Sequence, residues 1–172
     1  MKIEELEKKV EELEKQVKIN ADIEEIKRLQ YRYINSLIGH KWDDIIDCFA
    51  ENAEMDFRLV TKDRTYGEIK KGKAAIMNEF KQGIIKAHTG REGLFVVHPI
   101  INVDGDKATG RFLAYFMHVR SGGRDPLLHW MQGMYDGKYV KENNRWKFSV
   151  LKYRVRLRYK QSQMEYIECD LL

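Results

Sequence analysis

The main period of the apolar pattern changes near Gly93, and that change limits the folds available to this chain. Before Gly93 most apolar residues recur every three or four positions, as they do on amphipathic helices, apart from one short alternating segment. After it come four long extended segments, LFVVHPIINV, KATGRFLAYFMHV, LLHWMQGMYDGKYVKE and RWKFSVLKYRVRLRY, separated by the turn-forming DGD, SGGRDP and ENN. This order predicts an α+β domain in which a strongly curved, mostly antiparallel sheet wraps around N-terminal helices and encloses a pocket.

The N-terminal part predicts two helices, a strand and a further helix. After Asn20, a candidate N-cap or break, an apolar stripe begins that Gly39 ends, with members Ile23, Ile26, Leu29, Tyr33 and Leu37. A shorter helix then carries Trp42, Ile45, Ile46 and Phe49. The segment AEMDFRLV alternates as a strand with Met55, Phe57 and Leu59 on one face and Asp56 on the other. The next helix begins near Lys73 and carries Ile76, Phe80 and Ile84.

A heptad pattern marks the first residues of the chain. Its apolar members, at alternating spacings of three and four, are Ile3, Leu6, Val10, Leu13 and Val17. Such a short seam predicts either an oligomer contact or a helix that packs along its own domain, and the oligomer contact is favoured. We therefore expect a heptad helix over residues 1–20, a domain over 21–160 and a C-terminal tail over 161–172.

Composition excludes several classes of protein. The net charge is only +4 and the basic excess lies partly near the C-terminus, without an RNA-binding aromatic motif or a recognition helix, so no nucleic-acid partner is expected. Cys48 and Cys169 match no metal or redox spacing, which fits a reducing cytoplasm. No signal segment or membrane span is expected, because no apolar run approaches the necessary length.

Several motifs in their order resemble the SnoaL-like group of the NTF2-like (cystatin-like) superfamily. They are DIEEIKRL, GHKWDD, KGKAAIMNEF, HPIINVDGDKATGR and GMYDGKYVKENNRWKF, spread from about Asp22 to about Tyr159. Within the group, the helix lead-in and the last motif look most like bile-acid 7α-dehydratases. This resemblance implies a pocket for a small hydrophobic, steroid-like or polycyclic ligand, a cofactor-independent lyase (dehydratase) or isomerase activity, and a homo-oligomer, either a trimer or a dimer.

The family's working residues carry over only in part. The helix tyrosine falls on Tyr33, but the family aspartate falls on Ile38 and the family base histidine on Leu94. A second family tyrosine falls on Phe57 and a third near Arg124, while a family arginine falls on Arg154 or Arg156. An aspartate orients a histidine base and stabilises the cation that it forms, so this mechanism cannot run with isoleucine and leucine in their places.

Two histidines are candidate replacement bases. On an uninterrupted strand His98 shares the face of Leu94, although a histidine before Pro99 also suits a plain strand start. His129 is the second candidate, together with His118 on the neighbouring strand, and either also suits a surface position. No spacing among these and His88 identifies a metal site, so no metal and no cofactor are predicted.

Other polar residues complete the predicted site. Asp56 either pairs with a pocket histidine or lies on the solvent face of an edge strand. Tyr33, Tyr115 and Tyr135 either donate hydrogen bonds to a ligand or pack in the core. Strict alternation places five cations on one face of the last strand, namely Lys152, Arg154, Arg156, Arg158 and Lys160. Three interpretations of that face are open: it is exposed to solvent, it contacts another subunit, or one or two of its arginines bind an acidic group of a ligand.

Two functions follow as hypotheses. The first is a lyase or isomerase that abstracts a proton next to a carbonyl with His98 or His129 as the base. Tyr33 and an arginine of the last strand, Arg154 or Arg156, would polarise the oxygen. The second is a non-catalytic protein that binds a hydrophobic ligand or serves an enzyme as partner, which the apolar Ile38 and Leu94 favour.

Overall fold

The computed structural model describes residues 3–84, 93–120 and 127–161. Its elements are α1 (Ile3–Ile38), α2 (Trp42–Asp47), β1 (Phe49–Asp56), β2 (Leu59–Val60), β3 (Thr65–Tyr66), β4 (Lys70–Lys71), α3 (Lys73–Gln82), β5 (Gly93–Asp104), β6 (Lys107–Arg120), β7 (Leu127–Glu142) and β8 (Arg145–Gln161). His88, Arg124 and the predicted tail beyond Gln161 lie outside these residues, as does the side chain of His118.

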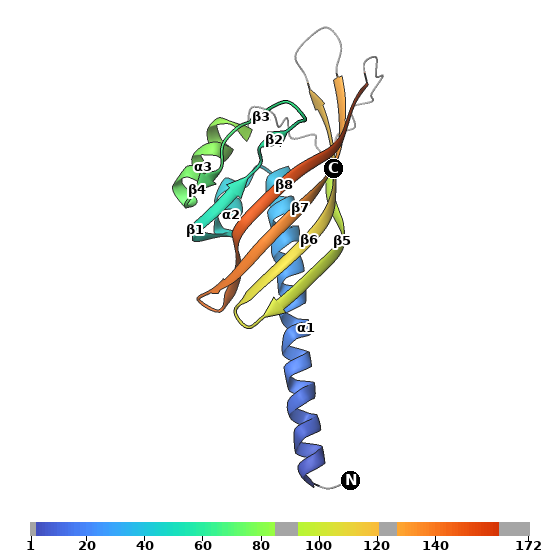
Figure 1. Cartoon of the computed structure of the whole chain (residues 1–172). Coiled ribbons are helices and arrows are strands. Elements are labelled where there is room, and N and C mark those ends of the chain that lie inside the picture. The colour runs from blue at the N-terminus through green and yellow to red at the C-terminus, as the bar shows by residue number, and fades with distance from the viewer. Residues whose placement is uncertain (1–2, 85–92, 121–126, 162–172) are drawn as a thin grey trace, which may run out of the picture.

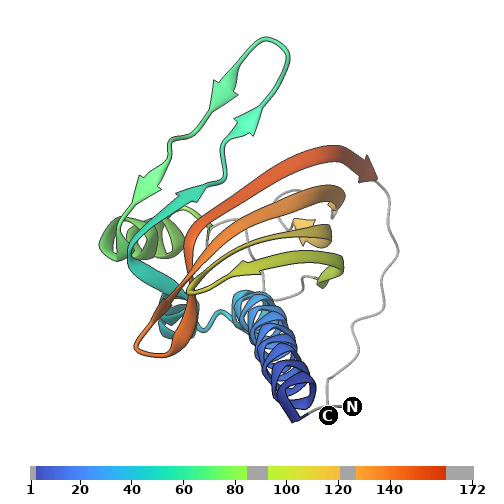
Figure 2. The same ribbon diagram turned by 60° about the horizontal axis from the view of Figure 1, so that its bottom comes forward.

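The main sheet has the strand order β4-β1-β8-β7-β6-β5. Strands β5 to β8 form the predicted antiparallel meander, and β1 joins its β8 edge as a parallel neighbour. The sheet curves strongly, and α1 runs along one side of it before extending past its end (Figures 1 and 2). The predicted α+β class and mostly antiparallel curved sheet are confirmed. We call the side that faces α1 the inner face and the opposite side the outer face.

Three local predictions were wrong. The helix does not break at Asn20: α1 continues to Ile38, and the Asn20 side chain accepts a hydrogen bond from Gln16 one turn earlier instead of capping a new helix. Phe49 belongs to β1 rather than to α2, since it pairs with Phe148 of β8. The strand containing Met55 ends at Asp56, and Leu59 starts the separate hairpin β2–β3.

A buried polar contact fastens α1 to the β7–β8 hairpin. The indole of Trp146 donates to Asp22 Oδ1 at 2.9 Å, and Lys141 Nζ lies 2.6 Å from the same oxygen. Burial alone raises the pKa of Asp22, but the hydrogen bonds from Lys141 and Trp146 outweigh it and the pKa lies below its ordinary value. This contact fixes where the helix crosses the sheet.

We expect Gly133→Ala to lower the free energy of unfolding by about 2–3 kcal/mol. A Cβ at this position would lie 2.6 Å from the backbone oxygen of Arg154 and 2.6 Å from the Tyr153 ring, so the two strands must separate. Urea denaturation measures the loss. In the matched Gly93→Ala variant the new atom lies 3.4 Å from the flexible end of the Met117 side chain and 3.9 Å from its Cβ, both tolerable distances. Equal losses in the two variants would contradict the steric explanation.

Candidate functional site

An aromatic cluster occupies the inner face, with Tyr33 of α1 at its centre. The Tyr33 ring packs edge-on against Tyr135 at 6.1 Å and against Phe148 at 5.6 Å, measured between ring centroids. Tyr135 continues the cluster to Tyr153 at 4.7 Å, and Phe57 lies 6.2 Å from both. Tyr33 and Tyr135 are buried, whereas Phe57 and Tyr153 are only partly covered. Among these four rings, Phe57 and Tyr153 are therefore the accessible ones.

Several buried polar groups near Tyr33 lack hydrogen bonds. Gln30 lies one turn before Tyr33 on the same side of α1, is fully buried, and neither its amide nitrogen nor its amide oxygen has a partner. The hydroxyls of Tyr139 and Tyr153 are likewise buried and unpaired. Tyr139 packs on Phe148, and Tyr153 packs on Tyr135. Phe148 and Tyr135 in turn contact the Tyr33 ring. Each such group costs about 1–3 kcal/mol, so their concentration around one residue indicates a site for a polar ligand atom.

The phenols of this cluster are hydrogen-bond donors at neutral pH. Burial raises the pKa of Tyr33 well above its ordinary value, with a further contribution from Tyr135, although the two hydroxyls make no hydrogen bond of standard geometry. Burial also raises the pKa of Tyr135 and Tyr139, and raises that of Tyr153 to about 12. Protonated phenols suit a ligand hydroxyl or carbonyl oxygen.

His129 lies on the inner face of β7, six residues from Tyr135, and is almost fully buried. Its Nδ1 is 3.1 Å from Nη2 of Arg158. A guanidinium only donates, so Nδ1 accepts this hydrogen bond and the ring is neutral with its proton on Nε2. The Nδ1 lone pair of His129 is therefore engaged by Arg158.

His98 does not share the face of Leu94. The register between β5 and β6 shifts between Val97 and Ile100, and His98 sits in this bulge with a φ of 51° and an exposed side chain. The expectation of an uninterrupted strand was wrong, because Pro99 cannot donate to the sheet and proline is accommodated at a bulge. Leu94 itself is buried beside Phe116 on the inner face.

Asp56 is buried rather than solvated, which corrects the prediction from alternation. Arg58 donates to both carboxylate oxygens, at 2.8 and 3.0 Å, and Arg154 Nη2 also contacts Oδ2. The hydrogen bond from Arg58, with a second from Arg154, holds the pKa of Asp56 well below its ordinary value against the effect of burial. Because Arg154 belongs to β8, its contacts with Asp56 anchor β1 to β8.

The basic residues of β8 do not share one face. Leu157 pairs with Gln132 and Val155 with Gly133, so Arg156 is an extra residue in β8. This bulge reverses the alternation: Arg154 lies on the outer face beside Asp56, whereas Arg158 reaches His129 on the inner face. Arg156 is exposed. Arg158 is thus the strand arginine on the inner face, which strict alternation could not reveal.

The remaining predicted residues divide between the two faces. Tyr115 lies on the outer face, where its hydroxyl accepts a hydrogen bond from Gln132 at 3.1 Å and its ring stacks on Phe95. Ile38 is partly buried and packs against the core at the end of α1. The structure therefore brings Tyr33, Phe57, Leu94, Tyr135 and His129 to the inner face and leaves His98, Tyr115 and Arg156 outside it.

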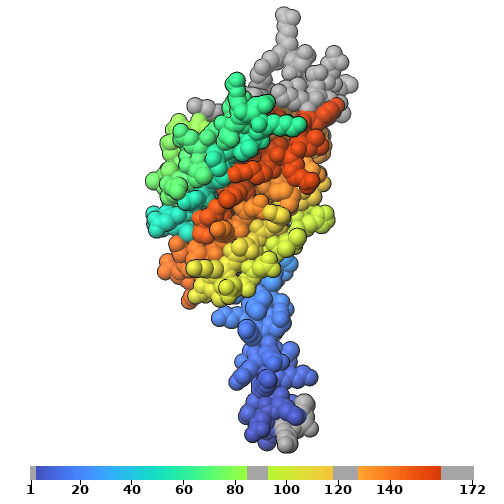
Figure 3. Space-filling model, in the orientation of Figure 1, coloured from blue at the N-terminus to red at the C-terminus, as the bar shows by residue number. Residues whose placement is uncertain are grey.

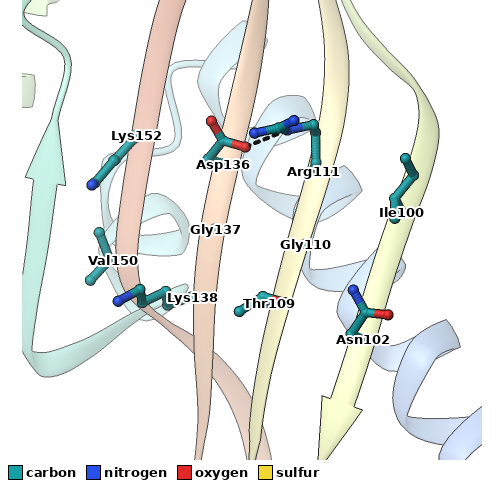
Figure 4. A pocket seen from close by; sticks show the side chains of 10 residues that line it. All are labelled: Ile100, Asn102, Thr109, Gly110, Arg111, Asp136, Gly137, Lys138, Val150 and Lys152. Atoms are coloured by element: carbon teal, nitrogen blue, oxygen red, sulfur yellow. Dashed lines mark hydrogen bonds and ion pairs between the residues drawn. The ribbon is translucent and has the colours of Figure 1, made fainter.

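A separate hollow of about 330 Å³ lies on the outer face (Figure 4). It is lined by Asn102, Thr109, Lys138 and Lys152, and by the ion pair between Arg111 and Asp136. A neighbouring hollow of about 530 Å³ shares Asn102, Thr109 and Lys138 with it. None of the predicted site residues lines either hollow, although Tyr139 of the inner-face cluster borders the second one. The ionic groups of the first hollow are paired or solvated, and the unpaired polar groups gather near Tyr33, so the inner face is the stronger candidate.

Within residues 3–84, 93–120 and 127–161, no three or more His, Cys, Asp or Glu side chains are grouped so as to hold a metal ion. In the same part of the chain no helix is long and apolar enough to span a membrane.

Solved structures with this fold are similar to the chain at low sequence identity. A candidate scytalone dehydratase from Novosphingobium aromaticivorans is 18% identical with a TM-score of 0.66, covering 81% of this chain and 87% of that one. The hexachlorocyclohexane dehydrochlorinase LinA-type3 from Novosphingobium barchaimii LL02 is 14% identical with a TM-score of 0.69, covering 87% and 96%. An NTF2-like protein with a cystatin-like fold from Novosphingobium aromaticivorans is 18% identical with a TM-score of 0.64, covering 84% and 88%. At these identities the similarity establishes the cystatin-like fold alone.

Sequence comparison assigns the family. No protein of curated function matches the chain. The model of the SnoaL-like domain matches residues 20–152, which include Gln30, Tyr33, Tyr135 and Tyr139 of the inner face and most of the sheet, while Tyr153 lies just beyond them. The chain therefore belongs to the SnoaL-like domain family.

Proposed function

We propose that this protein binds a small, hydrophobic, ring-containing molecule with a hydroxyl or keto oxygen on the inner face of its sheet. The observation that carries the proposal is the group of buried, unpaired polar atoms of Gln30, Tyr139 and Tyr153 around Tyr33. A ligand oxygen placed among them accepts from a phenol or from the Gln30 amide, while the aromatic rings cover the ring system. A steroid-like or polycyclic compound fits this combination.

Binding without proton transfer is the function that the geometry supports best. The resemblance assigns an orienting aspartate and a histidine base to two positions that hold Ile38 and Leu94 in this chain. The buried histidine of the inner face is neutral and its Nδ1 accepts from Arg158, so that lone pair is not available to take a proton from a ligand. The phenols remain protonated at neutral pH, and burial keeps them so.

We expect Tyr153→Phe to reduce the affinity for such a ligand about fivefold to tenfold, since one uncharged hydrogen bond contributes about 1 kcal/mol. A panel of 3-oxo-4-ene steroids, bile acids and their thioesters is screened by thermal shift, and the best ligand is titrated calorimetrically. Tyr115→Phe is the control, because it removes a phenol from the outer face. Equal loss in both variants, or loss in the control alone, contradicts a site on the inner face.

A cofactor-independent lyase or isomerase is the second candidate. It is favoured by the buried position of His129 next to Arg158, which together resemble an electrophilic clamp for a carbonyl oxygen. Two of the similar structures are named as a dehydratase and a dehydrochlorinase. Turnover of a 3-oxo-4-ene steroid substrate, followed by the absorbance of the conjugated dienone, that disappears in His129→Gln and persists in His98→Gln would favour this candidate over simple binding.

A further inference from the structure

The N-terminal half of α1 extends away from the domain as an exposed helix (Figures 1 and 3). Every residue from Ile3 to Lys18 is exposed. The apolar heptad positions are included, with 74% of Ile3, 57% of Leu13 and 66% of Val17 accessible. The alternative in which this segment packs along its own domain is therefore wrong, and the seam is available to another molecule.

The seam and the buried stripe of α1 lie on opposite sides of one continuous helix. Val10 is central in the seam and Gln30 is central in the part that packs on the sheet. At about 100° per residue, their separation of twenty residues corresponds to about 200° around the helix axis. A second helix can therefore pack along the seam without meeting the sheet of the same chain.

The charges beside the seam determine the direction of the partner helix. With Ile3, Val10 and Val17 at position a and Leu6 and Leu13 at position d, Lys9 falls at g and Glu7 and Glu14 at e. In a parallel pair a g residue faces the e residue of the next heptad on the partner, so Lys9 meets the partner's Glu14. In an antiparallel pair like charges would face each other. Two identical chains are thus complementary only in the parallel arrangement.

The residue types at the seam indicate the number of helices. β-Branched Ile and Val at a with Leu at d favour two strands over three or four. The next d position is Asn20 and the next a position is Glu24, and because both are polar the seam ends there. The buried stripe of α1 begins in the same place, at Asp22. We infer that two copies of this chain associate through residues 3–20 as a parallel two-stranded coiled coil, with Lys9 paired with Glu14 of the partner subunit.

Sedimentation equilibrium of the full-length protein tests this inference. The wild type is expected to show a concentration-dependent dimer, and Leu13→Glu is expected to be monomeric at the same concentrations. Lys9→Glu should weaken the dimer about tenfold, because it places like charges together twice. Lys9→Glu combined with Glu14→Lys should restore it, and Lys8→Glu, on the opposite side of the helix, should leave it unchanged.

Disulfide trapping tests the parallel direction. In a Cys169→Ser background, Val17→Cys should oxidise to a covalent dimer, because position 17 faces itself only when the helices are parallel, whereas Lys15→Cys should not. A trimer mass would overturn the two-stranded assignment. A dimer that survives Leu13→Glu, a monomeric wild type, or a Val17→Cys variant that does not cross-link would overturn the coiled coil.

Discussion

Replacing Gln30 with leucine is expected to stabilise the free protein and to weaken ligand binding at the same time. Gln30 is fully buried with neither amide atom hydrogen-bonded, so its removal in favour of an apolar side chain of similar size should raise the free energy of unfolding by about 1–3 kcal/mol. The same change removes a polar contact for the ligand, and affinity should fall at least about tenfold, or about 1.4 kcal/mol. Urea denaturation and ligand titration on one preparation measure both effects.

Gln132→Leu is the matched control for this variant. Gln132 lies on the outer face, is partly buried and donates to the Tyr115 hydroxyl, so its replacement should destabilise the protein or leave it unchanged, and should not affect binding. A Gln30→Leu variant that is less stable than the wild type, or that binds ligand equally well, would contradict the role given to Gln30. Stabilisation combined with lost binding is typical of residues kept for function rather than for stability.

Asp22→Ala is expected to lower the free energy of unfolding by about 3 kcal/mol. The change leaves the Trp146 indole without its acceptor and Lys141, which is largely buried, without its counter-charge. Asp22→Asn is the control, because it keeps an oxygen for Trp146 and removes only the charge, and its loss should be smaller. Thermal or urea denaturation at neutral pH separates the two contributions, and equal losses would show that the Trp146 hydrogen bond contributes nothing.

The contribution of Asp22 should also depend on pH. Its pKa in the folded protein lies below the ordinary value, so the unfolded chain takes up a proton first as the pH falls. The stabilisation is complete above about pH 5, well above the unfolded pKa of about 4, and is lost as the pH falls through the folded pKa. The difference in stability between wild type and Asp22→Asn should therefore shrink in acid. A constant difference down to about pH 2 would contradict this assignment.

The sequence predicted the sheet well because alternation and turn residues are local signals. The meander of β5 to β8 and the stripe of α1 around Tyr33 follow from them directly. The faces on which His98 and Arg156 lie could not be predicted in this way, because each residue sits in a bulge. One additional residue in a strand reverses the face of every side chain beyond it. A proline after His98 was the one local sign of such an irregularity.

Contacts between distant segments account for what the sequence left open at the site. Asp56 is buried by Arg154, which lies 98 residues away, and His129 is neutral because of Arg158, a contact that depends on the bulge. Gln30 was missed although it shares the helical face of Ile26 and Tyr33, where a polar residue within an apolar stripe is a signal in itself. Whether such a residue is paired or unpaired is decided only by the folded structure.

The side-chain amide resonances of Gln30, Asn102 and Asn52 provide the most direct measurement of the proposed site. Gln30 reports on the inner face, whereas Asn102 and Asn52 line the hollows of the outer face. In a ¹H–¹⁵N spectrum the Gln30 resonance is assigned by its loss in the Gln30→Leu variant. Addition of the steroid that gives the largest thermal shift should change the chemical shift of the Gln30 side-chain amide and leave those of both asparagines unchanged. Movement of Asn102 and Asn52 with an unchanged Gln30 would contradict a ligand site on the inner face.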